Sequence, residues 1–434
     1  MTPMLSILRT VTSLAAAFGF AITMQSASAQ APPIKVGILH SLSGMMAQSE
    51  TPLKDTLLML IDEQNRKGGL LGRKLEAVVA DPASDWPRFA EQARALLERD
   101  QVAVVFGCWT SVSRKAVLPV FEQLNGLLFY PLQYEGEEAS KNIFYTGATP
   151  NQQAIPAVEF LREDLGVQRW ALLGTDYVYP RTTNRILQTF LAAKGVSERD
   201  MLVRYTPFSH ADWKPIVEEL RAFAAQGRKT AVVSTIVGDA NVAFYRELAR
   251  QGVAASDIPV MTFTVGEHEL ATIDTAPLAG HYSAWNYFMS ARSPVNDEFI
   301  RKWQAYTRRP GSVISDPMEA HYIGFNLWVR AVEKAGSTNT DAVQKALIGV
   351  RVPNLTGGEA ELLPNHHITK PVLIGQIRKD GRIRTVWQSK SLIPGDAWSD
   401  YLPESKALSA DWSAQPGCGR YDGNARKCLD SALR

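Results

Sequence analysis

After its first 29 residues the sequence lacks any apolar run long enough to cross a bilayer. A membrane-spanning helix needs ~18 or more consecutive apolar residues, so we expect the rest of the chain to be soluble and not to span a membrane. Its 434 residues include 46 basic and 44 acidic side chains, a net charge of +2, without a basic tract or an acidic tail. This balance argues against a nucleic-acid partner. The length exceeds one ordinary core and suggests two lobes.

Cysteine is also scarce, with three residues in the chain. Cys418 and Cys428 flank a short segment near the C-terminus, and an oxidising compartment favours their pairing as a disulfide. Cys108 is left over, and we expect it to be buried. The sequence contains neither HExxH nor CxxC, and the neighbouring side chains of His366 and His367 would point to opposite faces of a strand. We therefore expect no metal and no cofactor, and interpret the two histidines as structural or surface residues.

The N-terminal segment has the pattern of a secretory signal. Arg9 precedes an apolar run from Val11 to Met24, and the small residues Ala27 to Ala29 provide a cleavage site. The run is too short to span a bilayer. Residues 1–29 are therefore predicted to be a signal peptide. Because no cysteine lies near the cleavage site, we expect an exported protein without a lipid anchor.

The next part of the chain alternates strand and helix patterns. Short, mostly apolar runs at 34–39, 75–79, 102–106 and 127–130 are separated by segments with apolar residues at helical spacing. Such alternation predicts parallel strands with right-handed crossovers. The Gly- and Pro-containing segment 144–151 precedes a second series of the same kind. The sequence thus predicts two doubly wound Rossmann-like α/β lobes, and near the end a hairpin around Lys379 to Arg382.

One junction between a strand and a helix has the features of a small-molecule site. The apolar run ends at Gly107, and a helical pattern begins near Thr110 and Ser111. The first turn of a helix has unpaired backbone N–H groups, and in an open α/β sheet ligands bind at the carboxyl ends of the strands. Trp109 adds a flat apolar face to the two hydroxyls.

Several separate runs resemble one family. They are GILHSLSGMMA from Gly37, VVFGCWTSVSRKAVLPVFEQLNGLLFYPLQYEG from Val104, NIFYTGATPNQQ from Asn142, DYVYPRTTN from Asp176 and GHYSAWNYF from Gly280. Together they resemble the urea-binding component of ABC urea transporters, which is related to short-amide sensors and to branched-chain amino-acid-binding proteins. The similarity covers Ile34 to Gln388. It implies a type I periplasmic binding-protein fold, in which two lobes joined by three crossing strands close on a ligand.

The resemblance also implies a domain organisation. We expect crossings near Gly147, Tyr282 and Pro353. Lobe 1 would then comprise residues 34–148 and 281–352, lobe 2 residues 149–280 and 353–400, and a C-terminal extension residues 401–434. The function implied is a periplasmic protein that captures urea between the lobes and delivers it to the membrane subunits of an ABC permease.

Ligand contacts can be carried over where the motifs match. In the related amide sensors an aromatic residue and a serine two positions later touch the ligand, and these correspond to Trp109 and Ser111. A Tyr-Pro pair corresponds to Tyr130 and Pro131, and two tyrosines of the second lobe correspond to Tyr177 and Tyr179. After the Tyr-Pro pair this chain has Leu132 and Gln133 where the sensors have Thr-Pro, which is closer to the urea-binding pattern. We therefore include Gln133 in the site.

Urea is planar and neutral, with four N–H donors and one carbonyl acceptor. The Thr110 and Ser111 hydroxyls suit its oxygen, Glu267 suits its amides as an acceptor, and Asp239 is a weaker candidate. Each residue has an alternative role. Ser111 could cap its helix, Glu267 could interact with the dipole of its own helix, and Trp109 and the second-lobe tyrosines could be packing residues. Tyr177 and Tyr179 would share one face if their segment were extended.

Other functions remain open at this stage. An amide sensor is disfavoured because such sensors work in the cytosol, whereas this chain has a signal peptide. A secreted amidohydrolase would need a base beside a nucleophile such as Cys108, and the sequence supplies none there, so we expect no enzyme. Branched-chain amino-acid binding stays an alternative to urea.

Overall fold

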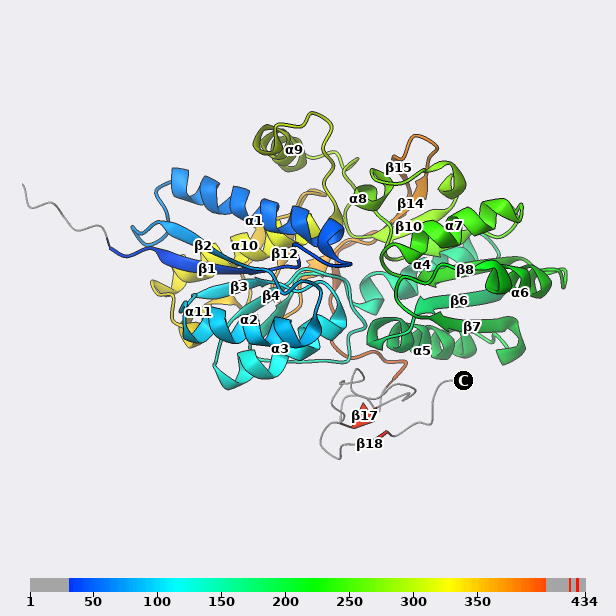
Figure 1. Ribbon diagram of the computed structural model, residues 1–434, viewed down its shortest axis with the longest axis horizontal. Coiled ribbons are helices and arrows are strands. Elements are labelled where there is room, and N and C mark those ends of the chain that lie inside the picture. The colour runs from blue at the N-terminus through cyan, green and yellow to red at the C-terminus, as the bar shows by residue number, and fades with distance from the viewer. Residues whose placement is uncertain (1–30, 403–420, 423–426, 429–434) are drawn as a thin grey trace, which may run out of the picture.

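The computed structural model describes residues 31–402, 421–422 and 427–428, which form two α/β lobes side by side (Figure 1). The predicted signal peptide, most of the predicted C-terminal extension, and Cys418 of the predicted disulfide lie outside the described residues. Near the C-terminus β17 (Tyr421–Asp422) pairs with β18 (Lys427–Cys428).

Lobe 1 is built on a five-stranded parallel sheet in the order β2-β1-β3-β4-β5. Its strands are short and mostly apolar, as buried parallel strands are: β1 (Ile34–Leu39), β2 (Leu75–Ala80), β3 (Val104–Gly107), β4 (Leu128–Tyr130) and β5 (Ile143–Tyr145). Three helices lie between them, and three more return from later in the chain: α1 (Ala47–Arg66), α2 (Trp86–Glu98), α3 (Ser111–Gln123), α9 (Pro294–Thr307), α10 (Asp316–Ala335) and α11 (Thr340–Leu347).

Lobe 2 has a seven-stranded sheet in the order β15-β14-β10-β9-β8-β6-β7. Its strands are β6 (Arg169–Thr175), β7 (Met201–Thr206), β8 (Thr230–Thr235), β9 (Val260–Thr262), β10 (Tyr282–Trp285), β14 (Leu373–Ile377) and β15 (Ile383–Gln388). Its helices are α4 (Ala154–Glu163), α5 (Val178–Ala193), α6 (Lys214–Ala224), α7 (Ala240–Arg250) and α8 (Glu267–Leu270). The strands β14 and β15 pair antiparallel, as the hairpin signal predicts.

The chain crosses between the lobes three times, and two crossings differ from the prediction. The first, between β5 and α4, contains Gly147 as expected. Tyr282 does not lie at a crossing, because β10 pairs with β9 and β14 inside the lobe 2 sheet, and the chain crosses only after Trp285. The hairpin of β11 (Arg351–Pro353) and β12 (Glu359–Glu361) belongs to lobe 1, since Leu355 and Ala360 pack in the lobe 1 core. The boundaries expected at 281 and 353 are therefore wrong.

The third crossing follows β13 (Thr369–Lys370), which pairs with β16 (Ile393–Pro394). The Lys370 ammonium is buried and donates to the Thr146 carbonyl of the first crossing at 3.1 Å. It also pairs with Glu319 at 3.3 Å. Asp316 accepts a hydrogen bond at 2.9 Å from the backbone of Asn286, in the second crossing. Buried charges need such partners, so this group connects all three crossings.

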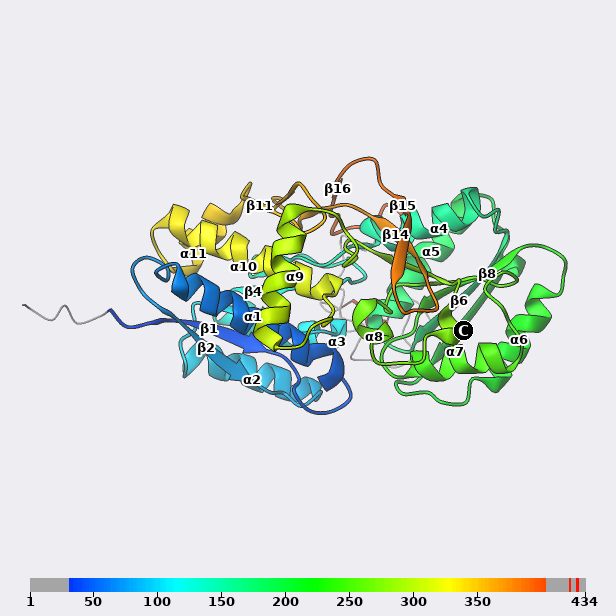
Figure 2. The same cartoon turned by 90° about the horizontal axis from the view of Figure 1, so that it is seen from above.

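Hydrogen bonds connect the two lobes. Gln133 of lobe 1 donates to the Phe263 carbonyl of lobe 2 at 3.0 Å. The His268 ring nitrogen lies 2.9 Å from the Gln48 carbonyl. Figure 2 shows α9 of lobe 1 and the β14–β15 hairpin of lobe 2, which both contribute residues to one pocket. Hydrogen bonds therefore link the two lobes directly.

Candidate functional site

The junction after β3 folds as the glycine break predicts, but the helix cap is a different residue. A Cβ atom at Gly107 would lie 2.3 Å from the Leu39 carbonyl oxygen, so only glycine allows the two strands to approach this closely. The helix α3 begins at Ser111, and the Thr110 hydroxyl caps it by accepting from the Ser113 N–H at 3.1 Å. The cap role considered for Ser111 therefore belongs to Thr110, and the Ser111 hydroxyl makes other contacts.

Ser111 is hydrogen-bonded to two charged side chains that the sequence analysis did not single out. Its hydroxyl donates to Glu135 Oε2 at 2.5 Å and accepts from Arg114 Nη1 at 3.1 Å. Arg114 Nη2 also donates to Glu135 Oε1 at 2.9 Å. All three side chains are at most 2% exposed. This Ser111–Arg114–Glu135 group places carboxylate oxygens, which accept hydrogen bonds, at the N-terminal end of α3.

A second carboxylate completes the charge balance beneath this group. Glu138 Oε1 accepts from Arg114 Nε at 2.9 Å, and Lys115 Nζ donates to Glu138 Oε2 at 2.8 Å. Burial by itself raises the pKa of Glu138, but the adjacent Arg114 and Lys115 hold it well below its usual range. Burial lowers the pKa of Arg114, and Glu138 and Glu135 more than reverse that effect. Two cations thus face two carboxylates in a buried network.

Aromatic rings enclose the arginine. The guanidinium carbon of Arg114 lies 4.7 Å from the ring centre of Tyr130 and 4.4 Å from that of Tyr134, which is cation–π geometry. The Tyr130 hydroxyl donates to the Trp109 carbonyl at 2.9 Å. Tyr130 is therefore held beside the charged group, and Trp109, 7% exposed, lies in the same region.

Lobe 2 contributes two tyrosines from the start of α5. Tyr177 precedes the helix and Tyr179 lies in its first turn, so they are not on an extended segment as assumed, although their ring centres are 6.2 Å apart. Burial raises the pKa of Tyr177 well above its usual range, and Tyr179, Tyr130 and Glu135 add to the effect. Both tyrosines pack against the hydrophobic core that contains Trp109 and Tyr130. The Tyr179 hydroxyl is buried and has no hydrogen-bond partner among the described residues.

Gln133 forms a hydrogen bond between the two lobes. Its Nε2 donates to lobe 2, while its Oε1 atom is buried and lacks a partner in the described part of the chain. Burial raises the pKa of the Tyr179 hydroxyl, and the Gln133 side chain lowers it by a smaller amount. These two polar groups are therefore close together. An acceptor and a hydroxyl, both buried and without a partner in the described part of the chain, therefore lie close together where the lobes meet.

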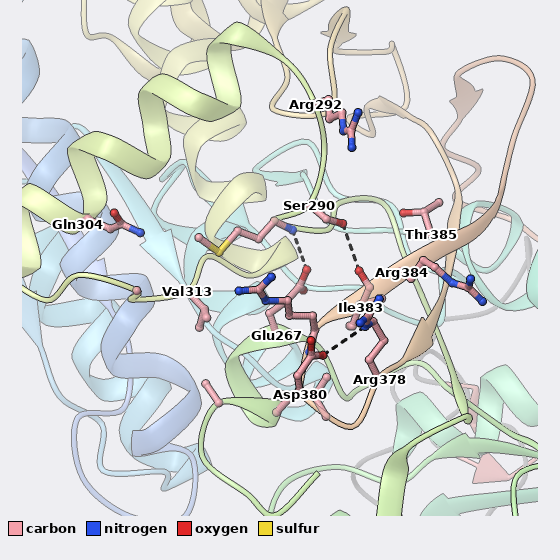
Figure 3. A pocket seen from close by; sticks show the side chains of 16 residues that line it. Glu267, Ser290, Arg292, Gln304, Val313, Arg378, Asp380, Ile383, Arg384 and Thr385 are labelled. Carbon is pink, nitrogen blue, oxygen red and sulfur yellow. Dashed lines mark hydrogen bonds and ion pairs between the residues drawn. The ribbon is translucent and has the colours of Figure 1, made fainter. Parts of the chain in front are cut away.

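The two acidic candidates of lobe 2 lie elsewhere. Asp239 precedes α7 and is exposed to solvent. Glu267 is 7% exposed, accepts from the Met289 N–H at 2.7 Å and lines a separate pocket beside the second crossing (Figure 3). Neither is hydrogen-bonded, within the described residues, to the Ser111–Arg114–Glu135 group.

Glu135 and Arg114 had weak signals in the sequence. Arg114 lies three residues after Ser111, and that spacing places both on one face of α3. Glu135 belongs to the run Tyr134 to Glu138, whose charges suggest a solvated loop. In the structure Glu135, Glu137 and Glu138 are all at most 5% exposed.

The remaining reactive side chains are structural. Cys108 is fully buried, as expected, and burial raises the pKa of its thiol, followed by the effect of Glu50. His367 is buried and hydrogen-bonded to the Tyr134 hydroxyl at 2.5 Å, and His366 stacks on Phe144. Among the described residues, no three His, Cys, Asp or Glu side chains gather as metal ligands. In the same residues no helix has the length and apolarity that a membrane crossing requires.

Comparison with known proteins agrees with this architecture. A family profile described as "Periplasmic binding protein domain" matches residues 34–404. The chain belongs to this family. Among solved structures, a solute-binding protein of an ABC transporter from Rhodopseudomonas palustris, in complex with p-hydroxybenzoic acid, superposes with a TM-score of 0.74 at 22% identity, covering 83% of this chain and 98% of that one. The type I periplasmic binding-protein fold is thereby confirmed.

Curated relatives point to the same class. A "Leu/Ile/Val-binding protein homolog 7" from Brucella melitensis is 24% identical over 87% of this chain and 97% of its own length. A "Leucine-, isoleucine-, valine-, threonine-, and alanine-binding protein" from Pseudomonas aeruginosa is 24% identical over 74% of this chain and 84% of its own length. The chain is a solute-binding protein of the ABC-transporter class, related to the branched-chain amino-acid-binding group. These homologues are binding proteins and not enzymes, as the sequence predicts for this chain.

Proposed function

We propose that this binding protein captures urea between its lobes in the periplasm and delivers it to the membrane subunits of an ABC permease. The observation that carries the proposal is the convergence of Ser111, Glu135 and Gln133 with the tyrosines of lobe 2. These groups supply several hydrogen-bond acceptors and hydroxyls at one place, and urea needs acceptors for four N–H donors.

The charge state of the site favours a neutral ligand. Arg114 and Lys115 are matched by Glu135 and Glu138 in direct pairs. An amino acid presents an ammonium and a carboxylate, and burying either without a countercharge is costly. Urea makes no such demand, and each of its faces can stack against an aromatic ring.

The size of the ligand limits its affinity. Urea has four heavy atoms, and the best very small ligands reach about −1.5 kcal/mol per atom, which gives roughly −6 kcal/mol and a dissociation constant in the tens of micromolar. We expect this affinity to be nearly flat between pH 5 and 9. The pKa values of Glu138, Arg114 and the site tyrosines are all displaced away from that range.

The second candidate is a branched-chain amino acid or a short amide, because the curated relatives carry names of the Leu/Ile/Val-binding group. Calorimetric titration of refolded, ligand-free protein with urea, acetamide and leucine separates the possibilities. Urea should bind most tightly, with little response to salt. Tighter binding of leucine, with a marked salt dependence, would reject urea as the ligand.

The variant Glu135→Gln tests the site itself. It keeps the shape of the side chain but removes the charge that accepts from Ser111 and Arg114, so urea affinity should fall by roughly 1.5–3 kcal/mol. The control Glu91→Gln alters an exposed carboxylate on α2. The Ser111→Ala variant should lose about 1–2 kcal/mol of binding free energy. An unchanged affinity in both site variants would place the ligand elsewhere.

A further inference from the structure

A pocket lies beside the second crossing, apart from the proposed interlobe site. It has a volume of about 970 Å³, a size typical of small-molecule sites. Four parts of the chain line it. They are α8 with Glu267, the crossing around Ser290, the β14–β15 hairpin of lobe 2, and, in lobe 1, Gln304 of α9 with the loop that follows this helix. A ligand there would touch both lobes and the segment that joins them.

The lining is rich in arginine. Arg292 comes from the crossing, and Arg378, Arg382 and Arg384 come from the hairpin. Figure 3 shows Arg292, Arg378 and Arg384 on different sides of Ser290. Arg378 pairs with Asp380 at 3.5 Å, and Arg384 donates to the neutral side chain of Gln376. Among the described residues no carboxylate pairs with the other two guanidinium groups.

The Glu267 carboxyl group, at the inner wall of the pocket, does little to cancel the positive charge of the arginines. Glu267 is almost fully buried, and burial raises its pKa to about 8. Hydrogen bonds from backbone N–H groups lower the pKa, but the nearby Asp316 raises it further. At neutral pH this carboxyl is therefore mostly protonated. The pocket then has an excess of positive charge, with hydroxyl and amide groups at Ser290, Thr385 and Gln304.

We propose that this pocket binds a small molecule with two or more anionic groups, carboxylate or phosphate. Guanidinium groups bind both kinds of oxyanion through paired hydrogen bonds. Arginines placed on the crossing and on the hairpin suit a ligand with separated charges better than a single anion. Because Gln304 and the adjacent loop come from lobe 1, such a ligand bridges the lobes next to the crossing, and its binding is linked to the angle between them.

Calorimetric titration of the full chain with citrate and with pyrophosphate tests the proposal, at ionic strength held constant with sodium chloride. The wild-type protein should bind at least one of the two, and the preferred one identifies carboxylate or phosphate chemistry. The double variant Arg382→Gln/Arg384→Gln should weaken that binding roughly tenfold or more, since charge-assisted hydrogen bonds are lost.

The matched control is Arg221→Gln/Arg246→Gln, which removes two exposed arginines from α6 and α7, outside the pocket. All four altered side chains are exposed, so both variants should fold, and circular dichroism checks this. Equal weakening in the two double variants would show that net charge alone attracts the anion. That result, or no binding of either probe to the wild-type protein at millimolar concentration, would overturn the proposal.

Discussion

The two walls of the proposed interlobe site are built differently. The lobe 1 wall is a buried ionic network in which Arg114 is hydrogen-bonded to Ser111, Glu135 and Glu138. The lobe 2 wall consists of neutral tyrosines, and the buried hydroxyl of Tyr179 has no partner in the described residues. Lobe 1 therefore has its polar groups already oriented, whereas the lobe 2 wall keeps hydrogen-bonding capacity for a ligand. A preoriented wall lowers the entropic cost of binding, and closure then adds the second wall.

Breaking the lobe 1 network should have the largest effect. Arg114→Met leaves Glu135 without its buried cation and Glu138 with Lys115 alone, and loss of one partner from a buried ion pair costs about 3–5 kcal/mol. Because urea is the proposed ligand, guanidinium and not urea should be the denaturant that measures the loss of stability, and calorimetry should measure the loss of urea binding. The control Arg246→Met removes an exposed arginine and should change stability by less than about 0.5 kcal/mol. Equal effects of the two substitutions would contradict the role given to Arg114.

A carboxyl of lobe 2 outside the site allows a second test. The pKa of Glu267 is about 8 in the folded protein, against a usual value of 4.5. Between these values the folded state keeps a proton that the unfolded state releases, so wild-type stability should fall as the pH rises from 4.5 to 8, by up to ~1.4 kcal/mol per pH unit. Glu267→Gln removes this dependence.

Thermal unfolding at pH 5, 7 and 9 measures the effect. As the pH rises from 5 to 7 to 9, the stability of Glu267→Gln relative to wild type should increase, and most of the increase should occur below pH 8. Urea affinity should stay unchanged, because Glu267 lies outside the proposed interlobe site. A large loss of urea affinity in this variant would return Glu267 to the list of ligand contacts. A stability difference that does not vary with pH would mean that the carboxyl is not held protonated.

The smallest effect is expected for a single hydroxyl of lobe 2. Tyr179→Phe removes a hydroxyl that has no partner among the described residues, so stability should hardly change, while urea affinity should fall by about 1 kcal/mol if that hydroxyl bonds the ligand. Tyr245→Phe is a matched control, because its hydroxyl is also buried and unpaired but lies in the lobe 2 core. If both variants bind urea as the wild type does, the lobe 2 wall is a packing surface only.

Much of the fold follows from local patterns. The period of the apolar residues indicates which segments are strands or helices, and the break at Gly107 locates the end of β3. The crossings after Trp285 and Lys370 were misplaced because short extended segments such as β10 and β11 show no local sign of which sheet they join. Pairing with β9 and β14 decides the place of β10, and burial of Leu355 and Ala360 decides that of the β11–β12 hairpin.

The candidate site likewise depends partly on local sequence and partly on tertiary structure. The sequence alone determined the strand-to-helix junction with Trp109, Thr110 and Ser111, and the motifs that carry the family resemblance supplied Tyr130, Gln133, Tyr177 and Tyr179. Only the tertiary structure decided that Glu135 is buried against Arg114 and that Glu267 faces another pocket. Ionic partners that are 21 residues apart in sequence, as Arg114 and Glu135 are, meet only when α3 and the loop after β4 pack together. Burial and charge pairing depend on the whole chain, whereas strand ends and helix starts depend on a few neighbouring residues.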